Sequence, residues 1–276
     1  MLLSLRTSEW IQLNFSLLLA VAAWFTSLPR SRKWIITVLG GAAATIIVLA
    51  LVLASVLSVN ASRVLRDWLT VPLFLVPYWQ TGQFFVATNP HIENFLLGID
   101  RRLFPRIAKH SGTARTRIGF VLEIAYLFCY PLVPLGLLTL YLAGHRERVA
   151  GFWLVVLVAT YLCYAITPFV PAYPPRSLGE INPAPPEQVN KGRILNRWIL
   201  RHGSIHAISF PSAHVAAAFA VALVLLHASL VPGLIFLSFA VAISMGAVIG
   251  RYHYALDVVL GALLALATFA VCFAHL

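Results

Sequence analysis

The sequence RYHYALDVVLGALLALATFAVCFAH, residues 251–275, joins a short polar segment to a long apolar run. About 20 consecutive apolar residues are enough for a helix to cross the hydrocarbon core of a bilayer. We therefore predict a transmembrane helix over residues 255–275, with the polar residues at its edge. Ionisable groups at membrane depth cost so much free energy that they usually mark a functional site.

The same length rule predicts seven further spans. Hydrophobic residues make up 60% of the 276 residues and charged residues only 11%, whereas a soluble domain carries about 25% charged residues. We therefore predict an integral membrane protein with an all-α fold, a polytopic transmembrane helical bundle of about eight spans. Pro72 and Pro77 interrupt the third span, which we expect to kink or to be partly re-entrant. The seven spans are 11–28, 34–58, 68–87, 117–143, 151–170, 210–229 and 232–250.

The spans fall into two predicted units. Residues 1–60 form an N-terminal pair of transmembrane helices, and residues 61–276 form a catalytic membrane domain with a core of five to six helices. Residues 88–116 repeat apolar residues at helical spacing beside charged ones, which indicates a helix at the membrane interface. Residues 171–208 are rich in Pro, Arg and Lys and are long enough to cap a site. The first apolar stretch lacks the features of a cleavable signal peptide, so we expect it to be retained.

The formal net charge of +11 comes from basic residues spread over short loops. This distribution favours contact with anionic lipid headgroups and argues against nucleic-acid binding. With eight spans, 15 of the 20 Lys and Arg residues fall on the face that carries the polar motifs, and 5 fall on the opposite face. The positive-inside rule then predicts that the motif face is cytoplasmic. If the third span is not a true crossing, the N-terminal part of this count reverses. We expect the protein to lie in the cell (inner) membrane. The cysteines, Cys129, Cys163 and Cys272, have no paired or metal-like spacing and are interpreted as small core residues.

His253 and Asp257 are spaced i, i+4, so on a helix they share one face. A carboxylate that accepts the Nδ1 hydrogen of a histidine leaves Nε2 free to act as a nucleophile or a base. The same pair could instead be a structural contact at a helix end, where an aspartate is favourable. The spacing alone leaves both interpretations open.

Two further motifs lie at span edges on the same predicted face. His214 follows Pro211 and Ser212 at the start of an apolar helix, where free N–H groups and the helix dipole attract anions. Arg176 follows the stiff segment PAYPP, residues 171–175, and a guanidinium can bind two phosphate oxygens at once. Each motif alone also fits an ordinary interfacial residue, but together they suit the breaking of a phosphate ester.

Other polar residues are weaker candidates. Glu123, with Tyr126 and Tyr130 on a similar helix face, either lines a polar cavity or stabilises helix packing through hydrogen bonds. His202 and His206 are also spaced i, i+4, but the sequence offers no third ligand near them. We therefore predict no metal site.

The motifs Pro-Pro-Arg at 174–176, Pro-Ser-Ala-His at 211–214 and His-Tyr-Ala-Leu-Asp at 253–257 together resemble the type 2 phosphatidic acid phosphatase superfamily. The chain looks most similar to the branch of the inositol phosphorylceramide synthases and related bacterial membrane phosphatases. Segments 66–68 and 98–104 also resemble that branch, and the whole resemblance covers residues 62–265.

The resemblance implies a mechanism through a phosphohistidine, without a metal or other cofactor. It implies that His253 attacks phosphorus, that Asp257 orients His253, and that His214 protonates the leaving alkoxide. These roles agree with the chemistry expected of the side chains themselves.

The resemblance also implies that Arg176 and Ser212 hold phosphate oxygens. Two basic positions of the family pattern are occupied by Phe169 and Ala247 in this chain. Arg251 could substitute for the second of them, so it joins the predicted phosphate-binding residues. Basic residues of the long connection could also supply charge, namely Lys191, Arg193, Arg197 or Arg201.

We therefore expect an integral membrane lipid phosphate phosphatase or phosphotransferase. Water as the acceptor makes it a phosphatase, and a second alcohol makes it a head-group transferase of the inositol-phosphorylceramide-synthase type. Its partners would be a lipid phosphate substrate and membrane lipids, with the identity of the lipid and the oligomeric state left open. The non-enzymatic alternative, a lipid-binding or transport protein, would require His214, His253 and Asp257 not to converge.

Overall fold

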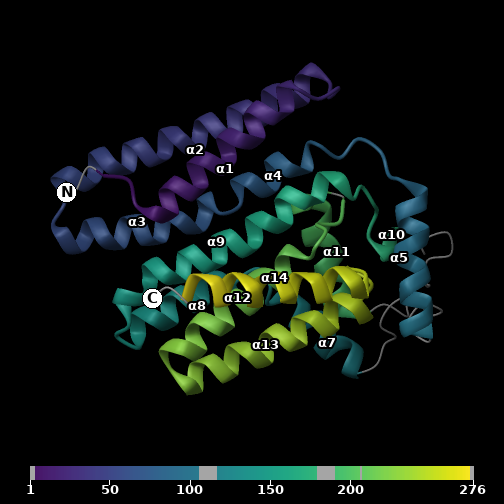
Figure 1. Ribbon diagram of the computed structural model, residues 1–276. Helices are drawn as coiled ribbons and strands as arrows, with labels where there is room; N and C mark the ends of the chain where they lie inside the picture. Colours follow the sequence, from purple (N-terminus) through teal and green to yellow (C-terminus); the bar gives the residue numbers. More distant parts are fainter. Residues whose placement is uncertain (1–3, 106–116, 179–189, 206, 274–276) are drawn as a thin grey trace.

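The computed structural model describes residues 4–105, 117–178, 190–205 and 207–273. All regular elements of these residues are helices, which confirms the predicted all-α fold (Figure 1). The chain runs back and forth between the two ends of an elongated bundle, and the start of α1 and the end of α14 lie toward the same end. The helices are α1 (Thr7–Trp24), α2 (Arg30–Val56), α3 (Val59–Leu73), α4 (Val76–Gly82), α5 (Pro90–Leu103), α7 (Arg117–Leu127), α8 (Leu132–Leu142), η1 (Arg146–Arg148), α9 (Val149–Ile166), η2 (Thr167–Phe169), α10 (Pro175–Leu178), α11 (Lys191–Gly203), α12 (Ala213–Ala228), α13 (Leu230–Ile249) and α14 (Ala255–Phe273).

Several of these helices are suited to a bilayer. In the described part of the chain, 4 helical segments are long and apolar enough to cross a membrane, namely α2, Arg146–Phe169, α13 and α14. The pair α7 and α8 would add a fifth if the two form one bent span. The protein is therefore an integral membrane protein, while the count of eight spans stays a prediction. Helix α12 is apolar but has only 16 residues.

Two of the predicted spans are broken. The third is interrupted between α3, which ends at Leu73, and α4, which begins at Val76, as its prolines indicated. The single span predicted over residues 117–143 is divided into α7 and α8, which are bent by 69° relative to each other. Pro131 immediately precedes α8 and has no N–H to donate to a carbonyl of the preceding turn. A continuous helix would therefore lose a hydrogen bond at this point.

Helices α9 and α12 form the centre of the bundle. The side chains of Phe152, Val156 and Leu157 on α9 are fully buried, and α12 packs against α9, α13 and α14. Helix α12 is rich in buried alanines, which let neighbouring helices approach closely. This close packing brings the polar residues at the start of α12 next to those that precede α14.

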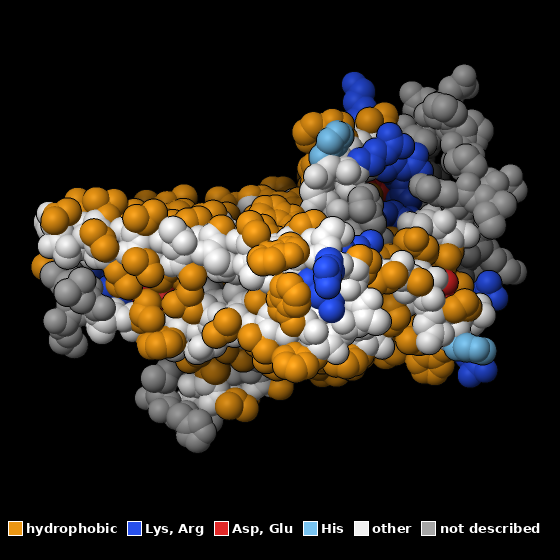
Figure 2. Space-filling view, turned by 90° about the horizontal axis from the view of Figure 1, so that it is seen from above, with side chains coloured by type: hydrophobic (Ala, Val, Ile, Leu, Met, Phe, Trp, Pro, Cys, Tyr) orange, Lys and Arg blue, Asp and Glu red, His pale blue; other side chains and the backbone are white. Residues whose placement is uncertain are grey.

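The face of the bundle seen in Figure 2 is apolar along its length, and its basic side chains gather toward one end. Exposed Val38, Leu49 and Val52 of α2 belong to the apolar flank, which suits contact with lipid chains. Figure 2 shows hydrophobic side chains along this flank and Lys and Arg side chains gathered toward the end that carries α5 and α11.

Helix α5 lies across that basic end, at a steep angle to the long helices (Figure 1). It confirms the helix predicted within residues 88–116, of which 106–116 lie outside the described residues. Buried Leu96 packs in a cluster with Ala172, Ile208 and Tyr254. Asp100 accepts a hydrogen bond from the backbone N–H of Ala255, 2.9 Å away, at the start of α14. Helix α5 thereby holds the segment that leads into α14.

Candidate active site

The turn between α13 and α14 presents His253. The backbone N–H groups of Tyr252 and His253 both donate to the carbonyl of Ala247, at 2.8 and 3.1 Å, which folds the chain back sharply. The backbone of Arg251 has a φ of 59°, in the left-handed region that residues other than glycine rarely adopt. The Nδ1 atom of His253 lies 3.1 Å from Oδ2 of Asp257, and both residues are buried. A carboxylate can only accept, so Nδ1 donates and the lone pair of Nε2 is left available.

The surroundings of His253 favour its neutral form. Burial is the main cause, and the positive charge of Arg176 adds to it, so that the pKa of His253 falls to about 3. The imidazole is therefore uncharged at neutral pH, as a nitrogen nucleophile must be.

The start of α12 is joined directly to α14. The backbone N–H of Ser212 donates to the carbonyl of Asp257 at 3.0 Å. Gly261 makes this approach possible, because a Cβ at that position would lie 2.5 Å from the Ser212 carbonyl oxygen. As a result, the rings of His214 and His253 lie with their centroids 5.8 Å apart.

Ser212 is buried and caps α12. Its hydroxyl oxygen accepts a hydrogen bond from the N–H of Val215, at 3.5 Å. A hydroxyl that accepts one hydrogen bond still carries a hydrogen to donate. Ser212 can therefore stabilise the helix and contact a bound anion at the same time.

Arg176 connects the first motif to the last. Its backbone N–H donates to the carbonyl of Arg251 at 2.9 Å, and its guanidinium lies over the ring of Tyr252, 5.3 Å from the centroid. Among the described residues, no carboxylate pairs with this guanidinium. The structure thus brings Arg176, Ser212, His214, His253 and Asp257 together from three separate segments.

The side chain of Arg251 has different surroundings. Burial lowers its pKa, and the negative charge of Asp100 on α5 partly offsets that effect. Burial also raises the pKa of Asp100 to about 6. Within the described residues, no hydrogen bond or ion pair joins the Arg251 side chain to either histidine. The structure therefore brings the backbone of Arg251 to the cluster and shows no contact of its guanidinium there.

A buried polar network around Glu123 contacts the turn between α13 and α14 at Gly250 and Tyr252. Glu123 of α7 pairs with Arg193 of α11 at 3.0 Å, and accepts hydrogen bonds from Asn196 at 2.7 Å and from the hydroxyl of Tyr252. Arg193 also donates to the carbonyl of Gly250 at 2.9 Å. Of the two interpretations of Glu123, the structure supports hydrogen-bonded packing.

This network could not be read from the chain. From the sequence, Arg193 was one of several basic residues that could supply charge to a phosphate, whereas the structure pairs it with Glu123, 70 positions away. Helix α11 lies in the connection predicted to cap a site, of which residues 179–189 and 206 lie outside the described residues. In the described part of the chain, no three His, Cys, Asp or Glu side chains are grouped as a metal ion would require.

Comparison with known proteins identifies the family. A sequence model of the PAP2 superfamily matches residues 94–271. Comparison with curated proteins gave no match, and comparison with solved structures gave none. The family match includes the Pro-Pro-Arg, Pro-Ser-Ala-His and His-Tyr-Ala-Leu-Asp segments that meet in this cluster, and it covers well over half of the chain. The chain therefore belongs to the PAP2 superfamily, as its motifs predicted.

Proposed function

We propose that the protein is a membrane-embedded lipid phosphate phosphatase that works through a phosphohistidine on His253. Membership of the PAP2 superfamily supports a phosphatase-type activity on lipid phosphates. The observation that carries the finer proposal is the buried His253–Asp257 pair, whose imidazole lies 5.8 Å from that of His214, centroid to centroid. At that spacing both rings can contact a single phosphoryl group, once side chains adjust to the substrate.

The first half-reaction transfers the phosphoryl group to the enzyme. The lone pair of His253 Nε2 attacks phosphorus, and the bond from phosphorus to the lipid oxygen breaks. Asp257 accepts a hydrogen bond from Nδ1–H of His253 and stabilises the positive charge that forms on the ring. Protonated His214 gives its proton to the leaving alkoxide, while Arg176 and the Ser212 hydroxyl bind the phosphoryl oxygens.

The second half-reaction releases phosphate and regenerates the free enzyme. Neutral His214 takes a proton from water, the resulting hydroxide oxygen attacks phosphorus, and the bond from nitrogen to phosphorus breaks to regenerate His253. A lipid alcohol in place of water would give a head-group transferase by the same steps. The guanidinium of Arg251 is influenced by the negative charge of Asp100 on α5. Arg251 would therefore contact the substrate only at the edge of the site.

The test is phosphate release by the purified protein from a panel of lipid mono- and diphosphates, measured without added metal, in the absence and in the presence of EDTA. We expect release by the wild-type protein and none by His253→Ala, because no other group would carry the phosphoryl intermediate. His227→Ala is the matched control, since His227 lies near the other end of α12, against Phe269 and Phe273. Loss of activity in EDTA would contradict a metal-independent reaction. Transfer to an added lipid alcohol without free phosphate would identify the transferase, and a wild-type protein inactive in both assays would favour lipid binding or transport.

A further inference from the structure

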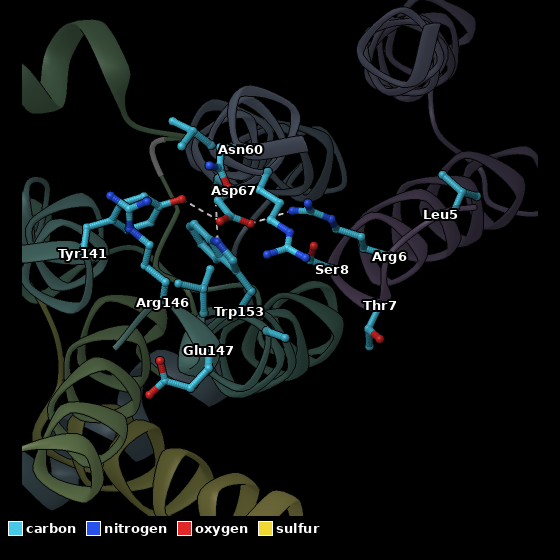
Figure 3. Close-up of a pocket in the computed structure, with 14 residues that line it drawn as sticks. Leu5, Arg6, Thr7, Ser8, Asn60, Asp67, Tyr141, Arg146, Glu147 and Trp153 are labelled. Atoms are coloured by element: carbon cyan, nitrogen blue, oxygen red, sulfur yellow. Dashed lines mark hydrogen bonds and ion pairs between the residues drawn. The ribbon is translucent and has the colours of Figure 1, made fainter. Parts of the chain in front are cut away.

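A cavity of about 570 Å³ lies at the bundle end opposite the histidine motifs. It is formed where the first turns of α1, α3 and α9 meet the end of α8 (Figure 3). Its volume falls within the range of about 300–1,000 Å³ typical of small-molecule sites. None of the residues assigned to the proposed reaction lines it.

The charge around this cavity is unusual for its end of the molecule. The eight-span topology leaves only five arginines on the face opposite the motifs, and all five lie at the cavity or next to a residue that lines it. Arg6, Arg63 and Arg146 line it, whereas Arg66 pairs with Glu9 and Arg148 lies 3.9 Å from Glu147. The few basic residues on this side of the membrane are therefore gathered around the cavity.

Both oxygens of the Asp67 carboxylate already accept hydrogen bonds from other side chains. Arg6 donates to one of its oxygens at 2.6 Å, and the hydroxyl of Tyr141 donates to the other at 2.6 Å. The indole N–H of Trp153 donates to the Asp67 carbonyl at 3.1 Å. Figure 3 shows Arg6 and Tyr141 approaching Asp67 from opposite sides, with the Glu147 carboxylate directed away from this group. Asp67 therefore organises the wall of the cavity and has little capacity left to neutralise further cations.

Two guanidinium groups at the cavity have no acidic partner in the part of the chain that the structure describes. Among the described residues, the side chains of Arg63 and Arg146 form no ion pair or hydrogen bond. Arg146 lies over the ring of Tyr141, 4.7 Å from its centroid, which orients it without neutralising it. Both arginines are exposed, so an anion can reach them from the lipid–water interface. Guanidinium groups match the oxygens of a phosphate in two-point hydrogen bonding.

The remaining lining suits a lipid. Tyr141 and Trp153 are the residue types that gather at membrane–water interfaces. Leu5, Val64 and Val149 supply apolar surface beside the arginines. We propose that this cavity binds the phosphate-bearing headgroup of an anionic phospholipid, in the leaflet opposite the catalytic histidines. The proposal is independent of the reaction assigned to His253.

The experiment uses the full chain in phosphatidylcholine nanodiscs and a phosphatidylglycerol that carries a photoreactive group beside its headgroup. We expect crosslinks in the peptides that contain residues 60–67 and 141–153. Unlabelled phosphatidylglycerol should displace them, whereas added phosphatidylcholine or inorganic phosphate should not. The double variant Arg63→Gln/Arg146→Gln should reduce this labelling by about fivefold for each arginine lost. Arg30→Gln is the matched control, because Arg30 is exposed and lies at the start of α2, away from the cavity lining.

The outcomes separate the possible ligands. Equal displacement by inorganic phosphate would overturn a lipid site in favour of a simple ion site, and equal displacement by phosphatidylcholine would overturn selectivity for anionic lipids. Unchanged labelling in the double variant would also overturn the proposal. The competition measurements on wild-type protein decide the question even if the double variant does not fold. Because His253→Ala should label normally, a failure of this proposal is distinguishable from a failure of the proposed reaction.

Discussion

At the scale of single residues, the surroundings of His253 determine its protonation state, which can be measured directly. Its pKa of about 3 lies below the ordinary value of 6.5, because the ring is buried and Arg176 is nearby. As the pH falls, the unfolded chain takes up this proton near 6.5 and the folded protein only near 3. The free energy of unfolding therefore decreases as the pH drops through that window.

We predict that the His253 ring does not titrate between about pH 5 and pH 8, the range in which an ordinary histidine changes charge. The measurement is the NMR chemical shift of ¹³Cε1-labelled histidine, with His253→Gln used to assign the signal. A midpoint near 6.5 would show that the ring is solvated and would contradict its buried, neutral state.

The role proposed for His214 predicts a dependence on the leaving group. His214→Ala should lower kcat for alkyl lipid phosphates by about 10²–10⁴-fold, the usual contribution of a general acid. Aryl phosphates with acidic leaving groups need no proton from the enzyme, so their kcat should fall much less. Steady-state rates with a series of phosphates whose leaving groups differ in pKa are the measurement. An equal loss across the series would assign His214 to binding instead.

At the scale of elements, the site depends on how closely α14 approaches the start of α12. Gly261 is the contact point, since a Cβ there would lie 2.5 Å from the Ser212 carbonyl oxygen. We predict that Gly261→Ala forces these helices apart, costs about 1–3 kcal/mol of stability and lowers kcat by about tenfold or more. Melting temperature and kcat on the preferred lipid phosphate measure the two effects.

Gly41→Ala is the control for this prediction. A Cβ at Gly41 would meet nothing within 4 Å, so the substitution adds the same methyl group to a helix without a clash. It should leave kcat unchanged and, through better helix propensity, not lower the melting temperature. Full activity in Gly261→Ala would mean that the spacing of α12 and α14 does not limit the reaction.

At the scale of the whole molecule, the two ends of the bundle differ in charge and carry different proposed sites. The charge count predicts that the end with the histidines faces the cytoplasm. In a cysteine-free background, Arg102→Cys on α5 marks that end and Ala143→Cys, after α8, marks the other; both positions are exposed. A membrane-impermeant maleimide on intact cells should label only Ala143→Cys, and both variants after permeabilisation. The reverse pattern would place the histidines outside, and labelling of both on intact cells would contradict the assignment of the two ends to opposite faces.

Local patterns in the sequence were enough for the membrane class, the helical fold and the family. The bilayer imposes a length and a composition on each spanning helix, so apolar runs such as residues 255–275 are visible without any tertiary contact. The His253–Asp257 pair was visible because the two residues are only four positions apart in the sequence, although His253 lies in the turn before α14 and not on the helix with Asp257. The break between α3 and α4 followed from the prolines alone.

Only the tertiary structure decided which distant residues share a site. Arg176, Ser212 and His214 reach the turn before α14 through backbone hydrogen bonds and a glycine contact that no local spacing encodes. The same is true of Arg193, which meets Glu123 across 70 positions of the chain. The gathering of Arg6, Arg63 and Arg146 around one cavity is also a product of packing. Hydrophobicity and helical periodicity are local quantities, whereas the convergence of charged groups depends on how close-packed helices place their ends, and that is determined only when the whole bundle forms.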